Sequence, residues 1–284
     1  MALEEFSREQ IERYSRHIRL AGFGPGGQRK LLESSVLMVG AGGLGSAALP
    51  YLAAAGVGKI GIADDDWVEL PNLHRQVIYF SADIGRRKTA SAAETLRALN
   101  PDCRVTTHPV RLSASNIQEI VRGYDLVLDG SDNFPTRFLV ADCCWFEKIP
   151  LVSAAAVGFE GQLFTVLPGP RAPCHRCLMP EPPEADRAAS CRLNGILGPV
   201  AGVMGTLQAV EALKVLLGIG SDMAERFLQY NALEGSFRTL KRTQDPDCPL
   251  CGEQPSITSL SAHSIRRCAD GQSESCHHGD LRTG

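Results

Sequence analysis

Four cysteines stand in two Cys-x-x-Cys pairs, Cys174 with Cys177 and Cys248 with Cys251. Two thiolates at this spacing can take two corners of a tetrahedron, so two such pairs complete a closed Zn²⁺ site. A closed site leaves no position for a substrate. We therefore expect a structural zinc that joins the loop after Leu167 to the last folded part of the chain.

A glycine-rich loop follows the strand-like run 36–39 directly and leads into an Ala/Leu-rich helical stretch. Its G-x-G-x-x-G spacing (Gly40, Gly42, Gly45) is typical of a nucleotide-binding turn, in which glycines let the backbone approach phosphate oxygens. The helix that follows offers N–H groups without helical partners to an anion. Asp64, about 20 positions further on, is placed to hydrogen-bond a ribose hydroxyl. The loop predicts a bound nucleotide and leaves NAD and ATP open.

Polar residues after the next strand ends help to separate these two nucleotides. The set comprises Asn72, Arg75, Gln76, Lys88 and Asp132. In open α/β sheets ligands bind at the carboxyl ends of the strands, where this set is expected to lie. Hydride transfer needs few cations directed at phosphate, whereas a triphosphate needs several, together with a carboxylate that can hold Mg²⁺. The set therefore favours ATP, although each cation alone would be typical of a solvated surface.

Cys191 is a further candidate for chemistry. It stands beside Arg192, a cation that favours the thiolate, and it follows residues 181–186 (EPPEAD), which we expect to be mobile and exposed. A lone cysteine is more often an inert small hydrophobe, and we interpret Cys191 as a bystander. Cys143 and Cys144 fall within an apolar helical stretch and are expected in the core.

The elements that must position these residues alternate between strands and helices. The expected strands are 36–39, 59–64, 104–109, 125–130 and 151–156, and helices are expected at 87–99, 115–121 and 134–146. Such alternation predicts an α/β fold with a doubly wound, mostly parallel, Rossmann-like sheet. Pro50 falls inside the helix expected after the glycine loop, which is a local conflict with that helix.

The two ends of the chain differ in character from its centre. Residues 8–19 are helical in pattern and precede a glycine-rich turn at 22–27. A long apolar helix at 200–217 leads to two short strands, 227–231 and 237–240, which we expect to continue the sheet before the second cysteine pair. We expect one domain over residues 1–252 and a disordered tail over 253–284, which is Ser-rich, polar and aperiodic.

Composition argues against several classes of protein. A chain of 284 residues that is 44% hydrophobic can bury a full-sized core. Its 29 basic and 32 acidic residues leave a formal net charge of -3, which does not suggest nucleic-acid binding. No apolar run approaches the roughly 18 residues of a membrane span. The acidic, polar N-terminus is unlike a signal peptide, so we expect a cytoplasmic protein with no membrane partner.

Taken in order, these motifs resemble those of the ThiF/MoeB adenylyltransferases, the bacterial relatives of ubiquitin-activating enzymes. The matching segments are ERYSRHIRL, the glycine loop, ADDD followed by NLHRQ, GRRK, DGSDN, GVMGTLQA and both cysteine pairs, from about residue 8 to residue 252. The resemblance implies an ATP-dependent enzyme that activates the C-terminal glycine carboxylate of a ubiquitin-like sulfur-carrier protein (ThiS/MoaD type). The product would be an acyl-adenylate for later sulfur transfer.

The resemblance also implies roles for individual residues. It assigns nucleotide binding to Gly40, Gly42, Gly43, Asp64, Asn72, Arg75, Gln76, Lys88 and Asp132. Among these, Arg75 and Lys88 would bind phosphates, and Asp132 would hold Mg²⁺. Arg16 would reach the ATP of the other subunit in a homodimer, and Cys191 would be the residue for any covalent step.

The partners follow from the same resemblance. The final strands would cradle the carrier's Gly-Gly tail. Only 32 residues (284 − 252) follow Gly252, too few for a rhodanese-like domain, so we expect a separate sulfurtransferase or persulfide donor. A C-terminal carboxylate, with a pKa of about 3.5, is already ionised at neutral pH and needs no general base to attack ATP.

Two other functions stay open. An NAD-dependent oxidoreductase explains the glycine loop and Asp64 but leaves Arg75, Lys88 and Asp132 without a role. A zinc-stapled binding protein with a vestigial nucleotide site would keep the same fold without the activity. The sequence does not distinguish a carrier for thiamine, molybdopterin, cysteine or another thio-product.

Overall fold

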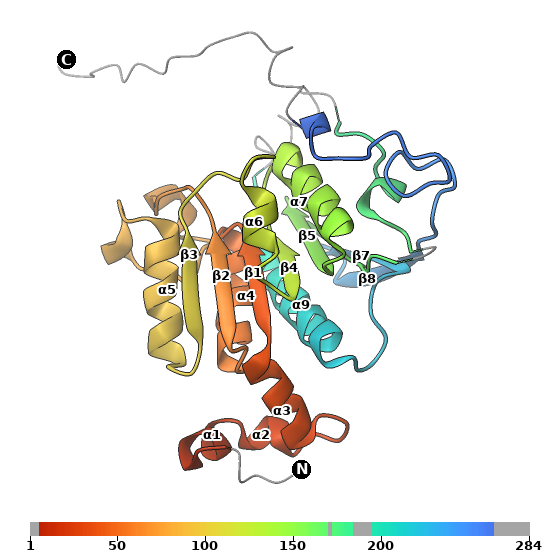
Figure 1. The fold of residues 1–284 in the computed structure, drawn as a ribbon. Helices are drawn as coiled ribbons and strands as arrows, with labels where there is room; N and C mark the ends of the chain where they lie inside the picture. The colour runs from red at the N-terminus through yellow and green to blue at the C-terminus, as the bar shows by residue number, and fades with distance from the viewer. Residues whose placement is uncertain (1–5, 170–171, 184–194, 264–284) are drawn as a thin grey trace, which may run out of the picture.

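Eight strands form one mixed sheet in the order β3-β2-β1-β4-β5-β6-β7-β8 (Figure 1). They are β1 (Ser35–Val39), β2 (Lys59–Ala63), β3 (Arg104–His108), β4 (Leu126–Asp129), β5 (Leu151–Val157), β6 (Glu160–Val166), β7 (Arg226–Asn231) and β8 (Ser236–Lys241). Strands β3, β2, β1, β4 and β5 run parallel, and β6, β7 and β8 join antiparallel. This computed structural model describes residues 6–169, 172–183 and 195–263. The predicted fold class, a doubly wound, mostly parallel sheet continued by C-terminal strands, is confirmed.

Helices cover both faces of the sheet. They are α1 (Arg8–Arg13), α2 (Ser15–Ile18), α3 (Gly24–Glu33), α4 (Gly43–Ala54), α5 (Lys88–Leu99), α6 (Ile117–Val121), α7 (Phe134–Glu147) and α9 (Gly198–Leu217), with 3-10 turns η2 (Leu70–Asn72), η3 (Ser81–Asp83) and η4 (His175–Cys177). Val36 and Met38 of β1 pack with α4, α5 and α9, whereas Leu37 and Val39 pack with α6 and α7. Both faces of β1 are therefore buried, as expected for a central parallel strand.

Helix α9 is long and apolar enough, by length and composition alone, to cross a membrane, and it is the one such helix among the described residues. The prediction that no apolar run approaches that length is therefore wrong, because α9 has 20 residues. The helix packs against α4, β5 and β6, and 50% of its apolar window is buried. Burial in the core accounts for its composition.

The N-terminal segment departs from the prediction. Most of residues 22–27, expected as a turn, form the start of α3, in which Pro25 lies in the first turn. A proline is tolerated there because its missing N–H would have no helical acceptor. The helical stretch expected at 8–19 is divided at Tyr14 into α1 and α2.

One strand, β6, is not evident from the sequence. It returns antiparallel from β5 through a turn at Gly158, whose φ is +57°. Its first residues, Glu160 and Gln162, are exposed and polar, so only its second half shows the continuous apolar character of a buried strand. The predicted strand 151–156 is therefore only the first arm of a hairpin.

The segment after the second cysteine pair packs on α7 as far as His263. Leu260 is only 6% exposed within the cluster that contains α7, and His263 Nε2 lies 2.8 Å from Asp142 Oδ2. The sequence predicts disorder over all of 253–284, and this first part differs because a few apolar residues find a place on the core. Residues 264–284 lie outside the described part of the chain.

Candidate active site and metal centre

The glycine loop turns sharply at the carboxyl end of β1. Gly40 has a φ of +86°, and a Cβ placed on it would lie 2.9 Å from the carbonyl oxygen of Gly130. A Cβ on Gly45 would lie 2.3 Å from the carbonyl oxygen of Gly40, closer than real contacts allow. Gly42 is the N-cap of α4 and Gly43 its first residue. The loop thus brings the N-terminus of α4 to the carboxyl ends of β1 and β4, as the G-x-G-x-x-G spacing predicts.

Asp64 follows β2, and its carboxylate binds two backbone segments, the glycine loop and its own turn. Its Oδ2 accepts from the N–H of Ala41 at 2.8 Å, and its Oδ1 accepts from the N–H of Asp66 at 2.8 Å. Burial raises the pKa of Asp64 above its ordinary value, and the Lys88 ammonium opposes that rise. Each carboxylate oxygen keeps a second lone pair, so Asp64 can still accept from a ligand hydroxyl.

Lys88 begins α5 and faces the acidic run after β2. Its Nζ lies 2.8 Å from Asp66 Oδ2; the Lys88 side chain is only 5% exposed, whereas that of Asp66 is 67% exposed. The sequence reasoning named Lys88 and missed Asp66 as its partner. The run of three consecutive aspartates, Asp64 to Asp66, was the available signal. In the structure one carboxylate oxygen from each of the three lies within 4.8 Å of the others.

The 3-10 turn η2 and the residues that follow it carry the remaining basic and amide side chains against the loop. Arg75 Nη2 donates to Asn72 Oδ1 at 2.8 Å, so these two side chains hold each other. Gln76 is buried, and its Nε2 lies 3.8 Å from the position of a Cβ on Gly42. Its Oε1 has no hydrogen-bond partner among the described residues. The structure therefore brings Asn72, Arg75 and Gln76 together beside the glycine loop.

Asp132 lies in the turn between β4 and α7, where the sequence places it. Its side chain is exposed and accepts from Asn133 Nδ2 at 3.3 Å. Asn133 is the N-cap of α7, since its Oδ1 accepts from the N–H of Thr136 at 2.9 Å. The N–H of Gly130 in the same turn donates to the carbonyl of Val39, directly before the glycine loop, at 2.9 Å, so Asp132 stands on the same rim as the loop.

A buried network beneath this turn was not recognised from the sequence. Asp129 is fully buried and accepts from the N–H and the hydroxyl of Ser131 and from the hydroxyl of Ser153. Arg137 donates to the carbonyls of Ser131 and Ala154, and its Nε lies 3.7 Å from Asp129. The motif DGSDN was the visible signal, but only the fold shows that its first aspartate points inward and its second outward.

Arg16 is exposed on α2, far from the glycine loop of its own chain. Neighbouring residues dock at the C-terminal ends of the sheet helices: Gln28 Nε2 donates to the carbonyl of Ala55 at 2.9 Å, and Arg13 Nη1 to that of Leu99 at 3.2 Å. The loop and Lys88 lie at the opposite ends of α4 and α5, each 12 residues long and therefore about 18 Å in length. Figure 1 shows α1 and α2 below the sheet.

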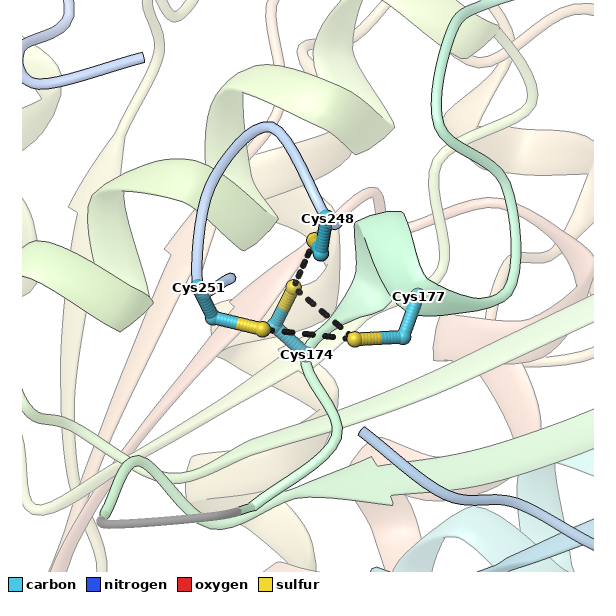
Figure 2. A group of neighbouring side chains, drawn as sticks. All are labelled: Cys174, Cys177, Cys248 and Cys251. Carbon is cyan, nitrogen blue, oxygen red and sulfur yellow. Dashed lines mark hydrogen bonds between the residues drawn. The ribbon is translucent and has the colours of Figure 1, made fainter. Parts of the chain in front are cut away.

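The four paired cysteines converge, as predicted (Figure 2). The Sγ–Sγ distances are 3.9 Å for Cys174–Cys177, 3.5 Å for Cys174–Cys248 and 3.3 Å for Cys177–Cys251. A tetrahedral zinc with Zn–S bonds of about 2.3 Å requires sulfurs about 3.8 Å apart, whereas a disulfide requires about 2.05 Å. The donor set and its spacing fit a closed zinc site, and they do not fit disulfides.

Two buried arginines attach this cluster to the sheet domain. Arg176, between the first two cysteines, donates from Nε and Nη2 to Asp142 of α7 at 2.9 and 2.8 Å. Arg242 donates to the carbonyls of Cys174 and Thr165 at 2.9 and 3.0 Å. The cysteine cluster is thereby tied to the core of the sheet and lies apart from the glycine loop. Cys191 lies in 184–194, outside the described residues.

Comparison with known proteins gives a family and several close relatives. The sequence matches the ThiF family over residues 14–250. It is 48% identical over 259 residues to the sulfur carrier protein adenylyltransferase of Thermus thermophilus, covering 90% of this chain and 96% of that protein. It is 49% identical over 244 residues to the SAMP-activating enzyme E1 of Haloferax volcanii, covering 86% of this chain and 90% of that protein.

Longer relatives and solved structures complete the comparison. The adenylyltransferase and sulfurtransferase MOCS3-1 of Zea mays is 49% identical over 251 residues, and the match covers only 53% of that protein. Among solved structures, E. coli MccB crystallised with MccA has a TM-score of 0.74 at 23% identity, covering 89% of this chain and 77% of that one. At such identity the likeness concerns the fold alone.

Proposed function

The chain belongs to the ThiF family, and on this premise we propose that it is an ATP-dependent adenylyltransferase acting on the C-terminal carboxylate of a ubiquitin-like sulfur-carrier protein. The observation that carries the proposal is the shared rim at the carboxyl ends of β1, β2 and β4. There a phosphate-type glycine loop, a buried lysine and several carboxylates meet. Relatives that match over nearly their whole length are named for this activity.

The chemistry requires positioning more than proton transfer. A carboxylate oxygen of the carrier attacks the α-phosphorus of ATP, the bond from that phosphorus to the bridging oxygen breaks, and pyrophosphate leaves. The attacking carboxylate is ionised at neutral pH, so no general base is needed. The barrier is the approach of an anion to a polyanion, which cationic side chains lower by stabilising the charge that develops on the phosphates.

The residues on the rim have separate tasks in this reaction. The N–H groups of the glycine loop and of the start of α4 bind phosphate oxygens. Asp64 accepts from the ribose, and Arg75 and Lys88 bind the phosphates. Asn72 holds the Arg75 guanidinium in place through its 2.8 Å hydrogen bond. Gln76 contributes its buried amide to the nucleotide pocket.

Asp132 is the proposed ligand for Mg²⁺. Its exposed carboxylate is an oxygen donor of the kind that Mg²⁺ prefers, and it follows β4 on the nucleotide rim. Mg²⁺ would neutralise charge on the phosphates. The buried network of Asp129 and Arg137 fixes the turn that carries Asp132, and this would hold the Asp132 carboxylate at the rim.

A homodimer is proposed because Arg16 lies too far from its own nucleotide rim to act there. Its position near the C-terminal ends of α4 and α5, at the end of the sheet opposite the rim, fits a role at the rim of a second subunit. The segment beside the rim is also apolar and exposed: the exposed fractions of Val77, Phe80 and Ile84 are 68%, 64% and 46%. Such a surface is typical of a contact between subunits.

The carrier's tail is proposed to lie along β6, β7 and β8, which extend the sheet beyond the nucleotide rim. A polar hollow of about 140 Å³, open to solvent, lies on these strands and is lined by Gln162, Gln229, Arg238 and their neighbours. An extended Gly-Gly tail is narrow enough for such a surface, and its backbone can bond to the polar side chains. Zinc would be structural, because all four of its donors come from the protein.

A separate sulfurtransferase or persulfide donor would complete the pathway, since adenylation itself transfers no sulfur. Reduced thiols and abundant ATP make the cytoplasm the compartment that suits this chemistry. Cys191 is proposed to be a bystander in adenylation, because carboxylate oxygen is the nucleophile. Cys191→Ser should leave carrier-dependent pyrophosphate exchange unchanged. A several-fold loss of thiocarboxylate in the same variant, measured by mass spectrometry with a persulfide donor, would instead give Cys191 a covalent role.

Carrier-dependent exchange of labelled pyrophosphate into ATP tests the proposal directly. We expect exchange only with ATP, Mg²⁺ and a Gly-Gly-ended carrier, and loss of exchange when the carrier's last glycine is removed. NADH binding without any effect of ATP would favour the oxidoreductase instead. Absence of exchange with every candidate carrier, although carrier is bound, would favour the zinc-stapled binding protein.

A further inference from the structure

Two side chains from outside the glycine loop bind the backbone N–H and the backbone carbonyl of one loop residue, Ala41. The N–H of Ala41 donates to Asp64 Oδ2 at 2.8 Å, and the carbonyl of Ala41 accepts from the hydroxyl of Tyr79 at 2.8 Å. Ala41 itself is fully buried. Both polar groups of this residue are therefore satisfied by side chains that come from outside the loop.

The direction of the next amide follows from covalent geometry. A trans peptide is planar, so its C=O and the N–H of the following residue point in opposite directions. None of the described peptides is cis. The bond from Tyr79 to the carbonyl of Ala41 therefore also orients the N–H of Gly42. Gly42 is the N-cap of α4, a position whose N–H has no helical acceptor.

Tyr79 is itself fixed in position. It is only 5% exposed, and its ring packs in the cluster that contains Ala41 and Leu44. Its own N–H donates to the carbonyl of Gln76 at 3.2 Å, so it belongs to the turn that carries the rim residues. Burial raises the pKa of Tyr79, and the hydroxyl therefore stays protonated and donates at every pH the enzyme meets.

We propose that Tyr79 is a positioning residue for nucleotide binding: its hydroxyl holds the Ala41–Gly42 peptide so that the Gly42 N–H faces the phosphates. The inference rests on the proposed function, because it assumes that phosphates bind at the start of α4. It goes beyond the glycine motif, since Tyr79 lies outside that motif and would touch no ligand atom. Tyr79 should therefore strengthen the binding of ligands that carry phosphates, such as ATP, and should not affect the binding of the nucleoside alone.

The test replaces Tyr79 by phenylalanine and compares ATP with adenosine as probes. Tyr79→Phe keeps the buried ring but leaves the carbonyl of Ala41 without its donor, a loss equivalent to about one hydrogen bond. We expect the Kd for Mg·ATP to rise about three- to tenfold, and the Kd for adenosine to change less than about twofold. The KM for ATP in pyrophosphate exchange should rise in parallel, with kcat and the KM for carrier nearly unchanged.

Tyr124→Phe is the matched control. The Tyr124 hydroxyl is also buried and hydrogen-bonded, to His108 Nε2 at 2.8 Å, but its partner is a side chain of β3 and not a backbone group of the glycine loop. Both variants should lose a similar few degrees of thermal stability, and only Tyr79→Phe should lose ATP affinity.

Equal effects of the two variants on ATP binding would overturn the proposal, as would a loss in Tyr79→Phe that is as large for adenosine as for ATP. The wild-type protein serves as the separate test of function. If it neither binds ATP nor exchanges pyrophosphate with a cognate carrier, the proposed function fails, and this inference fails with it.

Discussion

At the scale of single residues, the rim pairs buried charge with exposed charge. The Lys88 ammonium is almost completely withdrawn from water, yet its partner Asp66 is two-thirds exposed. One solvated carboxylate is a weak competitor for this cation, and a triphosphate offers more charge at the same place. The ion pair therefore keeps the Lys88 side chain oriented while leaving it available to a polyanionic ligand.

Lys88→Met should lower carrier-dependent pyrophosphate exchange by roughly a hundredfold, a loss of about 3 kcal/mol of transition-state stabilisation. The fold should hardly change, because Asp66 is left in water and needs no partner. Arg86→Met is the matched control, since Arg86 is on the same segment but pairs with Asp83 and Glu94. If the two variants keep similar activity, Lys88 has no special role at the phosphates.

Asp132→Ala should abolish Mg²⁺-dependent exchange, because it removes the carboxylate that follows β4. The expected loss is several kcal/mol, or a hundredfold and more. Asp65→Ala, a change in the exposed acidic run on the same rim, should cost much less. Titration of Mn²⁺ in the presence of ATP by electron paramagnetic resonance measures the metal separately from activity. Weaker Mn²⁺ binding in Asp65→Ala than in Asp132→Ala would move the metal site to the acidic run.

At the scale of elements, the cysteine cluster and α7 form one unit. The Arg176–Asp142 pair is buried and hydrogen-bonded at two positions, and His263 contacts the same carboxylate at 2.8 Å. Three segments that are distant in the chain thus meet on Asp142. Because a buried charge that loses its partner is costly, this junction resists separation of the cysteine cluster from the sheet.

Cys248→Ser should destabilise the fold without a selective loss of ATP binding. Loss of one thiolate ligand weakens the binding of zinc, and the free energy of zinc binding also contributes to the stability of the fold. A cost of about 3 kcal/mol corresponds to a fall in Tm of roughly 6–12 °C for a chain of this size. Cys103→Ser, at a buried cysteine outside the cluster, should keep one zinc per chain by metal analysis. Wild-type protein without zinc, with all four thiols titratable, would contradict the closed site.

Sequence reasoning located most elements because strands buried on both faces read as continuous apolar runs. It failed where local pattern and fold disagree. The exposed residues Glu160 and Gln162 hid β6, and Pro25 concealed the start of α3 by marking a turn where a first helical turn accepts it. Helix α4 continues through Pro50 because most of its residues are buried, and that packing offsets one lost hydrogen bond.

The candidate site was partly visible for a similar reason. Motif residues follow strand ends, so topology alone places Asp64, Lys88 and Asp132 on one rim. The residues that support the site belong to no recognisable motif and do not follow strand ends. Tyr79 and Arg137 act on backbone carbonyls from a distance in sequence, and only the folded chain shows which carbonyls those are.

At the scale of the whole molecule, the site is proposed to be incomplete in one chain. Arg16 and the glycine loop lie at opposite ends of α4, so a single subunit cannot bring them together without unfolding. A paired arrangement in which each subunit lends Arg16 to the other would make activity depend on association.

Mixing an Arg16→Ala chain with an Asp132→Ala chain tests this arrangement. Each variant alone should be nearly inactive, whereas heterodimers should regain one working site of two. Up to a quarter of wild-type activity is expected from a statistical mixture, because about half of the dimers are mixed and each has one intact site. Subunit exchange must be shown by native mass spectrometry. Exchange without recovery of activity would exclude a shared site.

The cysteine cluster has a consequence for the order of events during synthesis and folding of the chain. Cys177 and Cys248 are 71 positions apart (248 − 177), and the chain between them carries α9, β7 and β8. A metal that binds both would close a loop of chain that contains α9, β7 and β8, and closing so long a loop has an entropic cost of a few kcal/mol. Synthesis runs from the N-terminus, so the nucleotide rim as far as Asp132 exists before either cysteine pair. Capture of zinc by all four cysteines would therefore be a late event, which becomes possible only after β7 and β8 have been made.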